Sequence, residues 1–313
     1  MCANETGKLP HLADLIPRDD HDALFSEIER TIASVRPAVD FDTLETVFRD
    51  IIRLYNGEYP GFSRCRTEYH DLRHTLFAFV AMSRLMHGYI VAGESITERS
   101  VLLGLISALM HDTGYIQTDD DHDGTGAKYT LKHIARSIHF MQKYFIGHGF
   151  SSSDYTFCKH CILCTNINAV LDEIDFSTEE EATVGKMLGI SDLISQTSDR
   201  SYLEKLIFLY LEFVEGNVQG FANELDLLTK TIGFFDFTLK RFATEFDSLN
   251  EYMIHHFRAR YNIDADLYFL AIKKNLSYLT LLMDNNRGDF HNYLRRDGIL
   301  DKLSGDEHLA ILD

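Results

Sequence analysis

The chain has 313 residues, of which 45% are hydrophobic and 25% charged, as is ordinary for a soluble globular protein. Its net charge of −18 disfavours nucleic acid as a partner, because binding to a phosphate backbone needs a basic surface. No apolar run reaches the length of a membrane span, and the N-terminus lacks the basic and apolar regions of a signal peptide. Five cysteines without framework spacing complete the prediction of a reduced, cytoplasmic protein with no nucleic-acid or membrane partner. The oligomeric state stays open.

A long succession of helices is predicted along the chain. All four prolines lie in the first 60 residues, and the absence of proline from the rest suits continuous helices. Residues 1–20 are expected to form an arm, and residues 21–56 to form amphipathic helices interrupted at Pro37. The further predicted helices cover residues 68–92, 97–112, 127–146, 155–166, 178–196, 201–215, 221–246, 248–260 and 264–284. Strand-like alternation is scarce, so we predict an all-α fold, a multi-helix bundle around a metal site.

Histidine and aspartate side chains gather in two predicted helices. His70 and His74 are four residues apart and are expected to share one helix face. The run Val101–Met110 is apolar nearly all round, so it should be buried, and it ends at His111-Asp112. A helix that carries such residues into a core must neutralise or ligate them. A divalent metal does so well, because imidazole and carboxylate are among its usual ligands.

These residues, followed by Asp192 in Gly189-Ile190-Ser191-Asp192-Leu193, resemble the HD superfamily of metal-dependent phosphohydrolases. Within it, the chain is most similar to the catalytic domain of class I cyclic-nucleotide phosphodiesterases, from about Tyr69 to Phe246. The other motifs in this resemblance are Tyr69-His70-Asp71-Leu72-Arg73-His74-Thr75, Cys164-Thr165-Asn166, Glu212-Phe213 and Ile232-Gly233-Phe234-Phe235-Asp236-Phe237. The resemblance divides the chain into an N-terminal arm with helices (1–60), an HD/phosphodiesterase-like catalytic domain (61–285) and a C-terminal tail (286–313).

The resemblance implies a function and a set of site residues. It implies that a first divalent cation (Zn, Mn or Fe) is held by four residues: His74, His111, Asp112 and Asp192. Asp112 would also bridge to a second cation, Mg or Mn. The implied reaction is hydrolysis of a small anionic phosphoester, nucleotide-like and including cyclic nucleotides, by metal-activated hydroxide. Asp112 and His70 are then the catalytic residues, with His70 as the general acid that protonates the leaving alkoxide.

Several positions depart from the family pattern. Tyr115 replaces a histidine that orders water at the second metal, and Lys132-His133 replaces a pair of histidines. Thr231 stands where the family has a glutamine that reads purines, whereas Phe234 keeps the position that stacks on the base. Thr231 and Phe234 are therefore the candidate substrate-binding residues. Three further residues are candidates for contact with the metal ligands rather than with the metal: Tyr115, His133 and Asn166.

Two alternatives to a phosphodiesterase stay open. One is an HD-type phosphomonoesterase, which needs only the first metal. The other is a non-catalytic sensor or binding module that keeps the metal as a structural pin. The presence of His70 argues against this second alternative, because a structural site does not need an acid beside its ligands.

Four other motifs have simpler interpretations. Cys158, Cys161 and Cys164 are interpreted as small buried thiols rather than a zinc site. The acidic stretch within residues 118–126 is interpreted as a solvated loop at the rim of the active site. His133 and His160 are predicted either to lie near the metal or to be ordinary packing residues, and the sequence does not favour one of these roles. The pair His255-His256 is expected at the surface.

Overall fold

The computed structural model describes residues 9–17 and 20–304. The ends of the predicted N-terminal arm and C-terminal tail, and Cys2 with them, lie outside the described residues. Within those ranges the fold is all-α, as predicted, and the one β feature is an isolated bridge between Phe62 and Thr118. None of the helices in the described ranges is long and apolar enough to cross a membrane.

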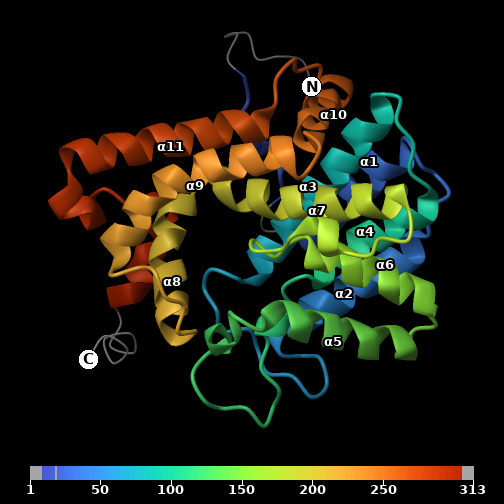
Figure 1. Cartoon of the computed structure of the whole chain (residues 1–313), viewed down its shortest axis with the longest axis horizontal. Coiled ribbons are helices and arrows are strands. Elements are labelled where there is room, and N and C mark those ends of the chain that lie inside the picture. The colour runs from blue at the N-terminus through green and yellow to red at the C-terminus, as the bar shows by residue number, and fades with distance from the viewer. Residues whose placement is uncertain (1–8, 18–19, 305–313) are drawn as a thin grey trace.

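Eleven α-helices form the body of the described chain (Figure 1). They are α1 (His21–Ala33), α2 (Phe41–Asn56), α3 (Leu72–Val91), α4 (Glu98–Met110), α5 (His133–Gly147), α6 (Ser152–Leu163), α7 (Glu179–Ser198), α8 (Tyr202–Glu215), α9 (Glu224–Thr244), α10 (Met253–Tyr261) and α11 (Leu267–Asn285). Short 3₁₀ segments join them: η1 (Leu12–Leu15), η2 (Thr113–Tyr115), η3 (Gly126–Tyr129), η4 (Leu171–Glu173), η5 (Leu249–Tyr252), η6 (Arg287–Asn292) and η7 (Arg296–Ser304).

Helices α3 and α7 form the centre of the bundle and pack against each other. Every residue of α3 from His74 to Gly88 is buried, because α1, α4, α7 and α10 all pack on this helix. One hydrophobic cluster runs from Leu12 near the N-terminus to Leu294 near the C-terminus, so the helices before residue 61 share their core with the rest. In Figure 1, α9 and α11 run along one edge of the molecule, beside the α3–α7 centre.

Several helices begin later than predicted, among them α9, α10 and α11, which begin at Glu224, Met253 and Leu267. Two further late starts affect residues of the candidate site. The predicted helix 68–92 begins at Leu72, because the side chain of Asp71 accepts a hydrogen bond from the backbone N–H of His74 and caps the helix. His70 therefore precedes α3, and the prediction that it shares a helix face with His74 is wrong. The predicted helix 127–146 begins at His133, after the short η3 turn.

The prediction that His256 lies at the surface is also wrong. His256 is fully buried, because α10 packs against α3 and its ring meets that of His87 edge-on at 5.0 Å. Gly88 permits this approach, since a Cβ there would lie 2.1 Å from the carbonyl oxygen of Tyr252. Both ring nitrogens of His256 and Nδ1 of His87 lack hydrogen-bond partners within the described structure.

This histidine pair predicts a loss of stability in mild acid. Burial and the charge of Arg260 lower the pKa of His87 from 6.5 to about 4, and burial lowers that of His256 as well. The unfolded chain therefore binds protons that the folded chain does not, so stability present above pH 6.5 is lost as the pH falls towards 4. At about 1.4 kcal/mol per pKa unit, His87 alone accounts for at most about 3 kcal/mol of that loss.

Urea unfolding of the wild type and of His87→Leu at pH 7.5 and pH 5 measures this effect. The difference in unfolding free energy between the two pH values should be smaller in the variant. Replacement of exposed His122 with leucine is the control and should leave the difference unchanged. An equal pH dependence in wild type and His87→Leu would contradict the prediction.

Candidate metal centre

Three elements bring the predicted ligands together. The Asp71 cap, with a bond of 2.8 Å to the backbone N–H of His74, fixes His74 in the first turn of α3. His111 closes α4 as its C-cap residue, and Asp112 follows with φ −110° and ψ 8°, where the chain leaves the helix. Asp192 comes from the middle of α7, the helix that packs on α3.

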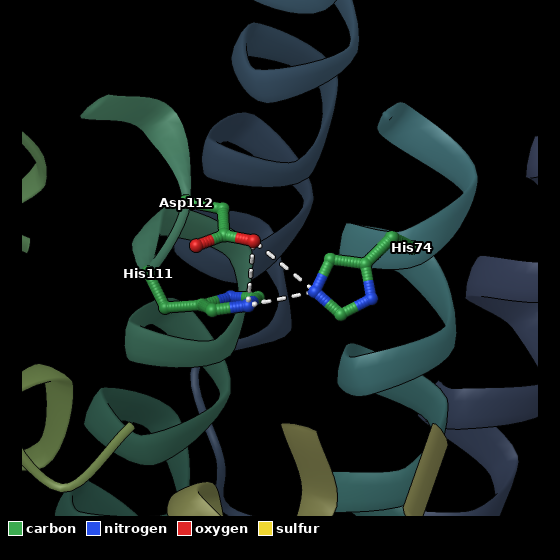
Figure 2. A group of neighbouring side chains, drawn as sticks. All are labelled: His74, His111 and Asp112. Atoms are coloured by element: carbon green, nitrogen blue, oxygen red, sulfur yellow. Dashed lines mark hydrogen bonds and ion pairs between the residues drawn. The ribbon is translucent and has the colours of Figure 1, made fainter. Parts of the chain in front are cut away.

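The side chains of His74, His111 and Asp112 converge in the core, as Figure 2 shows. The Nε2 atoms of the two histidines lie 3.3 Å apart. Oδ2 of Asp112 lies 3.1 Å from Nε2 of His74 and 3.4 Å from Nε2 of His111. All three residues are buried, and the group they form could hold a metal ion. We call these three residues the His-His-Asp cluster.

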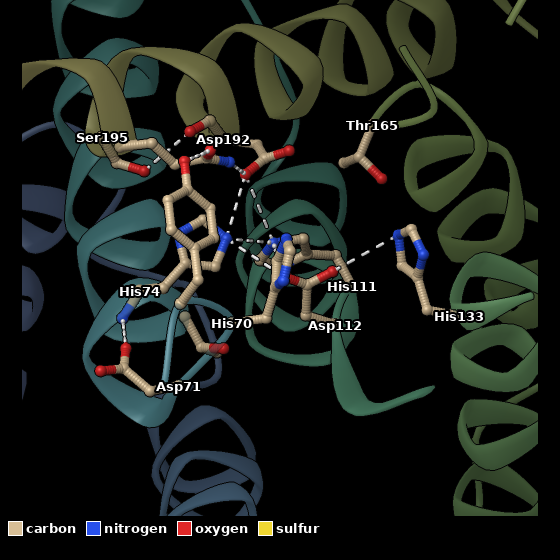
Figure 3. A network of polar contacts seen from close by, with 12 residues as sticks. His70, Asp71, His74, His111, Asp112, His133, Thr165, Asp192 and Ser195 are labelled. Carbon is tan, nitrogen blue, oxygen red and sulfur yellow. Dashed lines mark hydrogen bonds and ion pairs between the residues drawn. The ribbon is translucent and has the colours of Figure 1, made fainter. Parts of the chain in front are cut away.

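Asp192 lies against both imidazoles of this cluster (Figure 3). Its Oδ1 is 3.2 Å from Nε2 of His74 and 3.6 Å from Nε2 of His111. The same oxygen accepts a hydrogen bond of 2.6 Å from the amide of Gln196, one turn further along α7. Gln196 in turn accepts a hydrogen bond of 2.7 Å from the hydroxyl of Tyr69. The four residues predicted as ligands are thus brought together, and Gln196 and Tyr69 orient the fourth.

Opposite charges balance in this buried site. Burial disfavours the charged form of His74, but hydrogen bonds and charges from Asp112 and Asp192 outweigh burial and raise its pKa to about 9. The same two carboxylates raise the pKa of His111, again against the effect of burial. Although burial acts to raise the pKa of both aspartates, the histidines hold those pKa values well below the ordinary range. Two charged carboxylates in the core therefore demand positive charge beside them, from protons or from a cation.

The donor set fits a divalent cation. Nδ1 of His111 lies 2.8 Å from the carbonyl oxygen of Ala108, so in the neutral ring Nδ1 carries the proton and donates it there. The lone pair of Nε2 then points into the cluster, and metal-ligating histidines commonly have this second hydrogen bond. Two imidazole nitrogens and one or two carboxylate oxygens suit several first-row divalent metals.

His70 lies beside the cluster but outside the ligand group. Its Nδ1 is 2.6 Å from Oε2 of buried Glu212 on α8, and its ring centre is 5.8 Å from that of His74. The other carboxylate oxygen of Glu212 accepts a hydrogen bond of 2.7 Å from the backbone N–H of Tyr69. Glu212 thus fixes both the backbone before His70 and the orientation of its ring.

Tyr115 fills the space between His70 and His133. Its ring stacks on His70 with centres 4.2 Å apart and planes at 10°, and on His133 with centres 4.7 Å apart and planes at 20°. Nε2 of His133 lies 3.7 Å from Oδ1 of Asp112, and burial lowers the pKa of His133. Gly114 lets α5 approach so closely, because a Cβ there would lie 2.0 Å from the carbonyl oxygen of His133. Of the two histidines for which the sequence left two roles open, His133 and His160, it is His133 that lies next to the cluster.

The remaining candidate residues make other contacts. Thr231 is buried on α9, and its hydroxyl donates to the carbonyl oxygen of Leu227 at 2.9 Å. Phe234, half-buried on α9, stacks on Phe237, with ring centres 6.2 Å apart. Oδ1 of Asn166 accepts a local hydrogen bond from the backbone N–H of Asn168. Among the described residues, no hydrogen bond or ion pair joins these three candidates to the cluster.

The other sequence motifs lie outside the cluster. His160 is buried and pairs with Glu181 at 2.7 Å, so it packs as a structural residue. Cys158, Cys161 and Cys164 are buried free thiols, as predicted. In the acidic loop, five residues are exposed, which agrees with the predicted solvated loop: Asp119, Asp120, His122, Asp123 and Gly124.

The sequence assigns no role to three contributors to the site. Glu212 and Tyr69 appear there only as parts of motifs, and no local pattern connects Glu212 to His70, which lies 142 residues away. Gln196 is not singled out at all. Its position four residues after Asp192 on a predicted helix is the signal that could have found it, because such residues are neighbours on a helix surface.

Removal of the Asp71 cap is expected to disturb both the fold and the site. Asp71→Ala should lower the unfolding free energy by about 1–2 kcal/mol, the usual cost of a lost N-cap. Because the cap also holds His74, metal affinity should fall by about tenfold, as for other residues that orient ligands. Urea unfolding and metal titration measure the two effects.

Asp40→Ala is the matched control for this prediction. Asp40 caps α2 through a hydrogen bond of 3.0 Å from the backbone N–H of Thr43, away from the cluster. It should lower stability by a similar amount and leave metal affinity unchanged. Equal metal affinities in the two variants would show that the cap does not position His74.

Comparison of the sequence with known protein families gives no match, and comparison with curated proteins gives no match. The candidate function therefore depends on the geometry described above and on the residue patterns in the sequence.

Proposed function

We propose that the chain is an HD-type, metal-dependent phosphohydrolase acting on a small anionic phosphoester, a nucleotide-like phosphodiester first of all. The observation that carries this proposal is the buried His-His-Asp cluster with Asp192 against it and with the His70–Glu212 pair beside it. A metal held only as a structural pin needs the cluster but not the pair. The alternative is a phosphomonoesterase, which would use the same cluster for metal-dependent hydrolysis of a phosphate ester.

The residues divide into two groups in this proposal. His74, His111, Asp112 and Asp192 would hold the cation, which supplies Lewis acidity towards water and the phosphoryl group when bound. His70 donates a proton to the leaving oxygen of the ester. Glu212 accepts a hydrogen bond from Nδ1 of His70, which leaves Nε2 as the nitrogen that exchanges the proton. The stacked ring of Tyr115 covers one face of His70 and keeps water from that face.

A substrate panel with controlled metal content tests this proposal. The full chain is stripped with a chelator, reloaded with Mn²⁺, Mg²⁺ or Zn²⁺, and analysed for bound metal. Cyclic nucleotides, bis(p-nitrophenyl) phosphate and phosphomonoesters are then offered to each sample. We expect metal-dependent opening or hydrolysis of diesters. Hydrolysis of monoesters alone would favour the phosphomonoesterase, and stoichiometric metal without any hydrolysis would favour the structural pin.

Weak discrimination between adenine and guanine is a further expectation of this proposal. The single hydroxyl of Thr231 already donates to Leu227 and cannot offer the paired donor and acceptor of an amide. Stacking on Phe234 could contribute roughly 1–3 kcal/mol with little dependence on the base. We therefore expect kcat/KM for cyclic AMP and cyclic GMP to differ by less than about 10², the range beyond which hydrogen-bond readout is needed. A larger ratio would mean that another side chain reads the base.

A further inference from the structure

A cavity of about 440 Å³ lies outside the His-His-Asp cluster. It is lined by the N-terminal segment around η1, by the C-terminal end of α7 with the residues after it, and by the first half of α11 (Figure 1 shows the two helices). Its volume falls within the range of about 300–1,000 Å³ that is usual for small-molecule sites. We call it the α11 cavity.

The α11 cavity is apolar at one end and polar at the other. Leu267 and Tyr268, at the start of α11, line the apolar end. Arg84 donates hydrogen bonds both to the hydroxyl of Tyr268 and to the carbonyl oxygen of Leu15, which places the N-terminal segment, with its lining residues Leu12 and Ile16, beside this end. Two helical turns further along α11, Lys274 and Asn275 line the cavity. A helix rises about 1.5 Å per residue, so the two ends are separated by about 10 Å.

Three cationic side chains line the polar end. Arg296 donates hydrogen bonds to the backbone carbonyl of Arg200 at 2.8 Å and to Oδ1 of Asn275 at 3.1 Å. Because Asn275 follows Lys274 on α11, these bonds bring the backbones of Arg200 and Lys274 close to the guanidinium of Arg296. Among the described residues, no ion pair joins Arg200, Lys274 or Arg296 to a carboxylate, and the guanidinium of Arg296 donates to two uncharged oxygens. Glu204 is the nearby carboxylate: it accepts a hydrogen bond of 3.1 Å from the backbone N–H of Arg296, and burial raises its pKa while the charge of Arg296 acts to lower it.

The carboxylates that line the cavity have other partners. Asp199 accepts a hydrogen bond of 3.2 Å from Arg73 and another from the backbone N–H of Ser201. Asp14 accepts one from the backbone N–H of His11, the residue before η1. In a chain of net charge −18, three cations with no side-chain ion pair among the described residues, at the end of a sizeable cavity, favour an anionic ligand.

We propose that the α11 cavity binds a small amphipathic anion: one carboxylate, phosphate or sulfonate group on an apolar body about 10 Å long. The anionic group lies among Arg200, Lys274 and Arg296, where charge-assisted hydrogen bonds are available. The apolar body lies along α11 towards Leu267, where its burial is favourable. A medium-chain acyl carboxylate and the corresponding alkyl phosphate share this chemistry.

The α11 cavity adjoins the candidate metal centre. Phe77, Ser195 and Asp199 line the cavity and also line a narrow pocket that reaches Tyr69 and His74. The hydroxyl of Ser195 donates to the backbone carbonyl of Asp192 at 2.9 Å. An occupant of the cavity thus contacts residues next to the metal ligands without contacting the ligands themselves. Its binding needs neither the metal nor the proposed hydrolysis.

The probe for this site is 8-anilino-1-naphthalenesulfonate, which carries one anionic group on an aromatic body and fluoresces in apolar surroundings. The full chain is titrated with it, with and without metal. We expect saturable binding of one molecule per chain in both samples. Octanoate and octyl phosphate should displace the probe, and inorganic phosphate at the same concentration should not. Equal displacement by inorganic phosphate would overturn the amphipathic ligand, and lack of saturable binding would overturn the site.

Charge and shape variants locate the binding. Arg200→Ala combined with Lys274→Ala should weaken probe binding at least about tenfold, while Lys273→Ala is the matched control. Lys273 is exposed on the same helix, lies over the ring of Phe269 and does not line the cavity. Ala271→Trp should block the cavity and abolish binding. Thermal unfolding of each variant shows that the fold is kept. If the charge variants bind the probe as tightly as the control, the α11 cavity is not the site.

Discussion

Asp112→Asn is expected to abolish stoichiometric metal binding and to remove any metal-dependent hydrolysis with it. Asp112 contacts both cluster histidines, as Asp192 does, and its Oδ1 also faces His133. The asparagine keeps the shape of the side chain but removes its charge, so the cation loses one of its two anionic ligands, the one inside the cluster. Elemental analysis after dialysis against metal-free buffer measures the loss, and unfolding in urea measures its effect on stability.

The stability of the same variant is expected to fall as well. In the metal-free chain, the charged Asp112 faces two histidines whose pKa values it raises, and removal of one partner from a buried charged group typically costs about 3–5 kcal/mol. Asp264→Asn is the control, because Asp264 pairs with Arg258 at the exposed surface. It should retain both metal and stability. Full metal occupancy in Asp112→Asn would rule out Asp112 as a ligand.

Hydrophobic periodicity predicts most of the fold because the helices are long and few turns interrupt them. The predicted helix 97–112, for example, runs from Glu98 to Met110. The start of α3 was not predicted, because Asp71 suits either a helix interior or a cap, and only the hydrogen bond to the backbone of His74 decides between them. The burial of His256 was missed because it depends on the packing of α10 on α3, which no local pattern records.

In the candidate site, too, the features that depend on local sequence were predictable, and the contacts between residues far apart in the chain were not. A metal is expected at His111-Asp112 because these residues end a strongly apolar segment, where a charged group needs a partner. The full ligand set, which adds His74 and Asp192, is implied by the resemblance in motif order, and the structure places the carboxylate of Asp192 against both histidines. The contacts that orient the site, from Glu212 to His70 and from Tyr69 to Gln196, join residues more than 120 positions apart and arise only from the folded arrangement.

His70→Ala should leave the metal bound and lower turnover of unactivated phosphodiesters by about 10²–10⁴, the usual contribution of a general acid. His70 contacts Glu212 and Tyr115 rather than the cluster carboxylates, so its removal should not release the cation. The loss should be much smaller for bis(p-nitrophenyl) phosphate, because a nitrophenolate leaves without a proton. Turnover of both substrates and the metal content of the same samples are measured together.

Glu212→Gln tests the contribution of the hydrogen-bond partner of His70 apart from that of His70 itself. This prediction, like the one for His70→Ala, rests on the proposed hydrolysis. Glutamine can still accept from the backbone N–H of Tyr69 but removes the charge opposite Nδ1 of His70. We expect a smaller loss than in His70→Ala, with the same dependence on the leaving group. If His70→Ala lowers turnover of activated and unactivated substrates equally, or loses its metal, then His70 serves as a ligand or a packing residue and not as the acid.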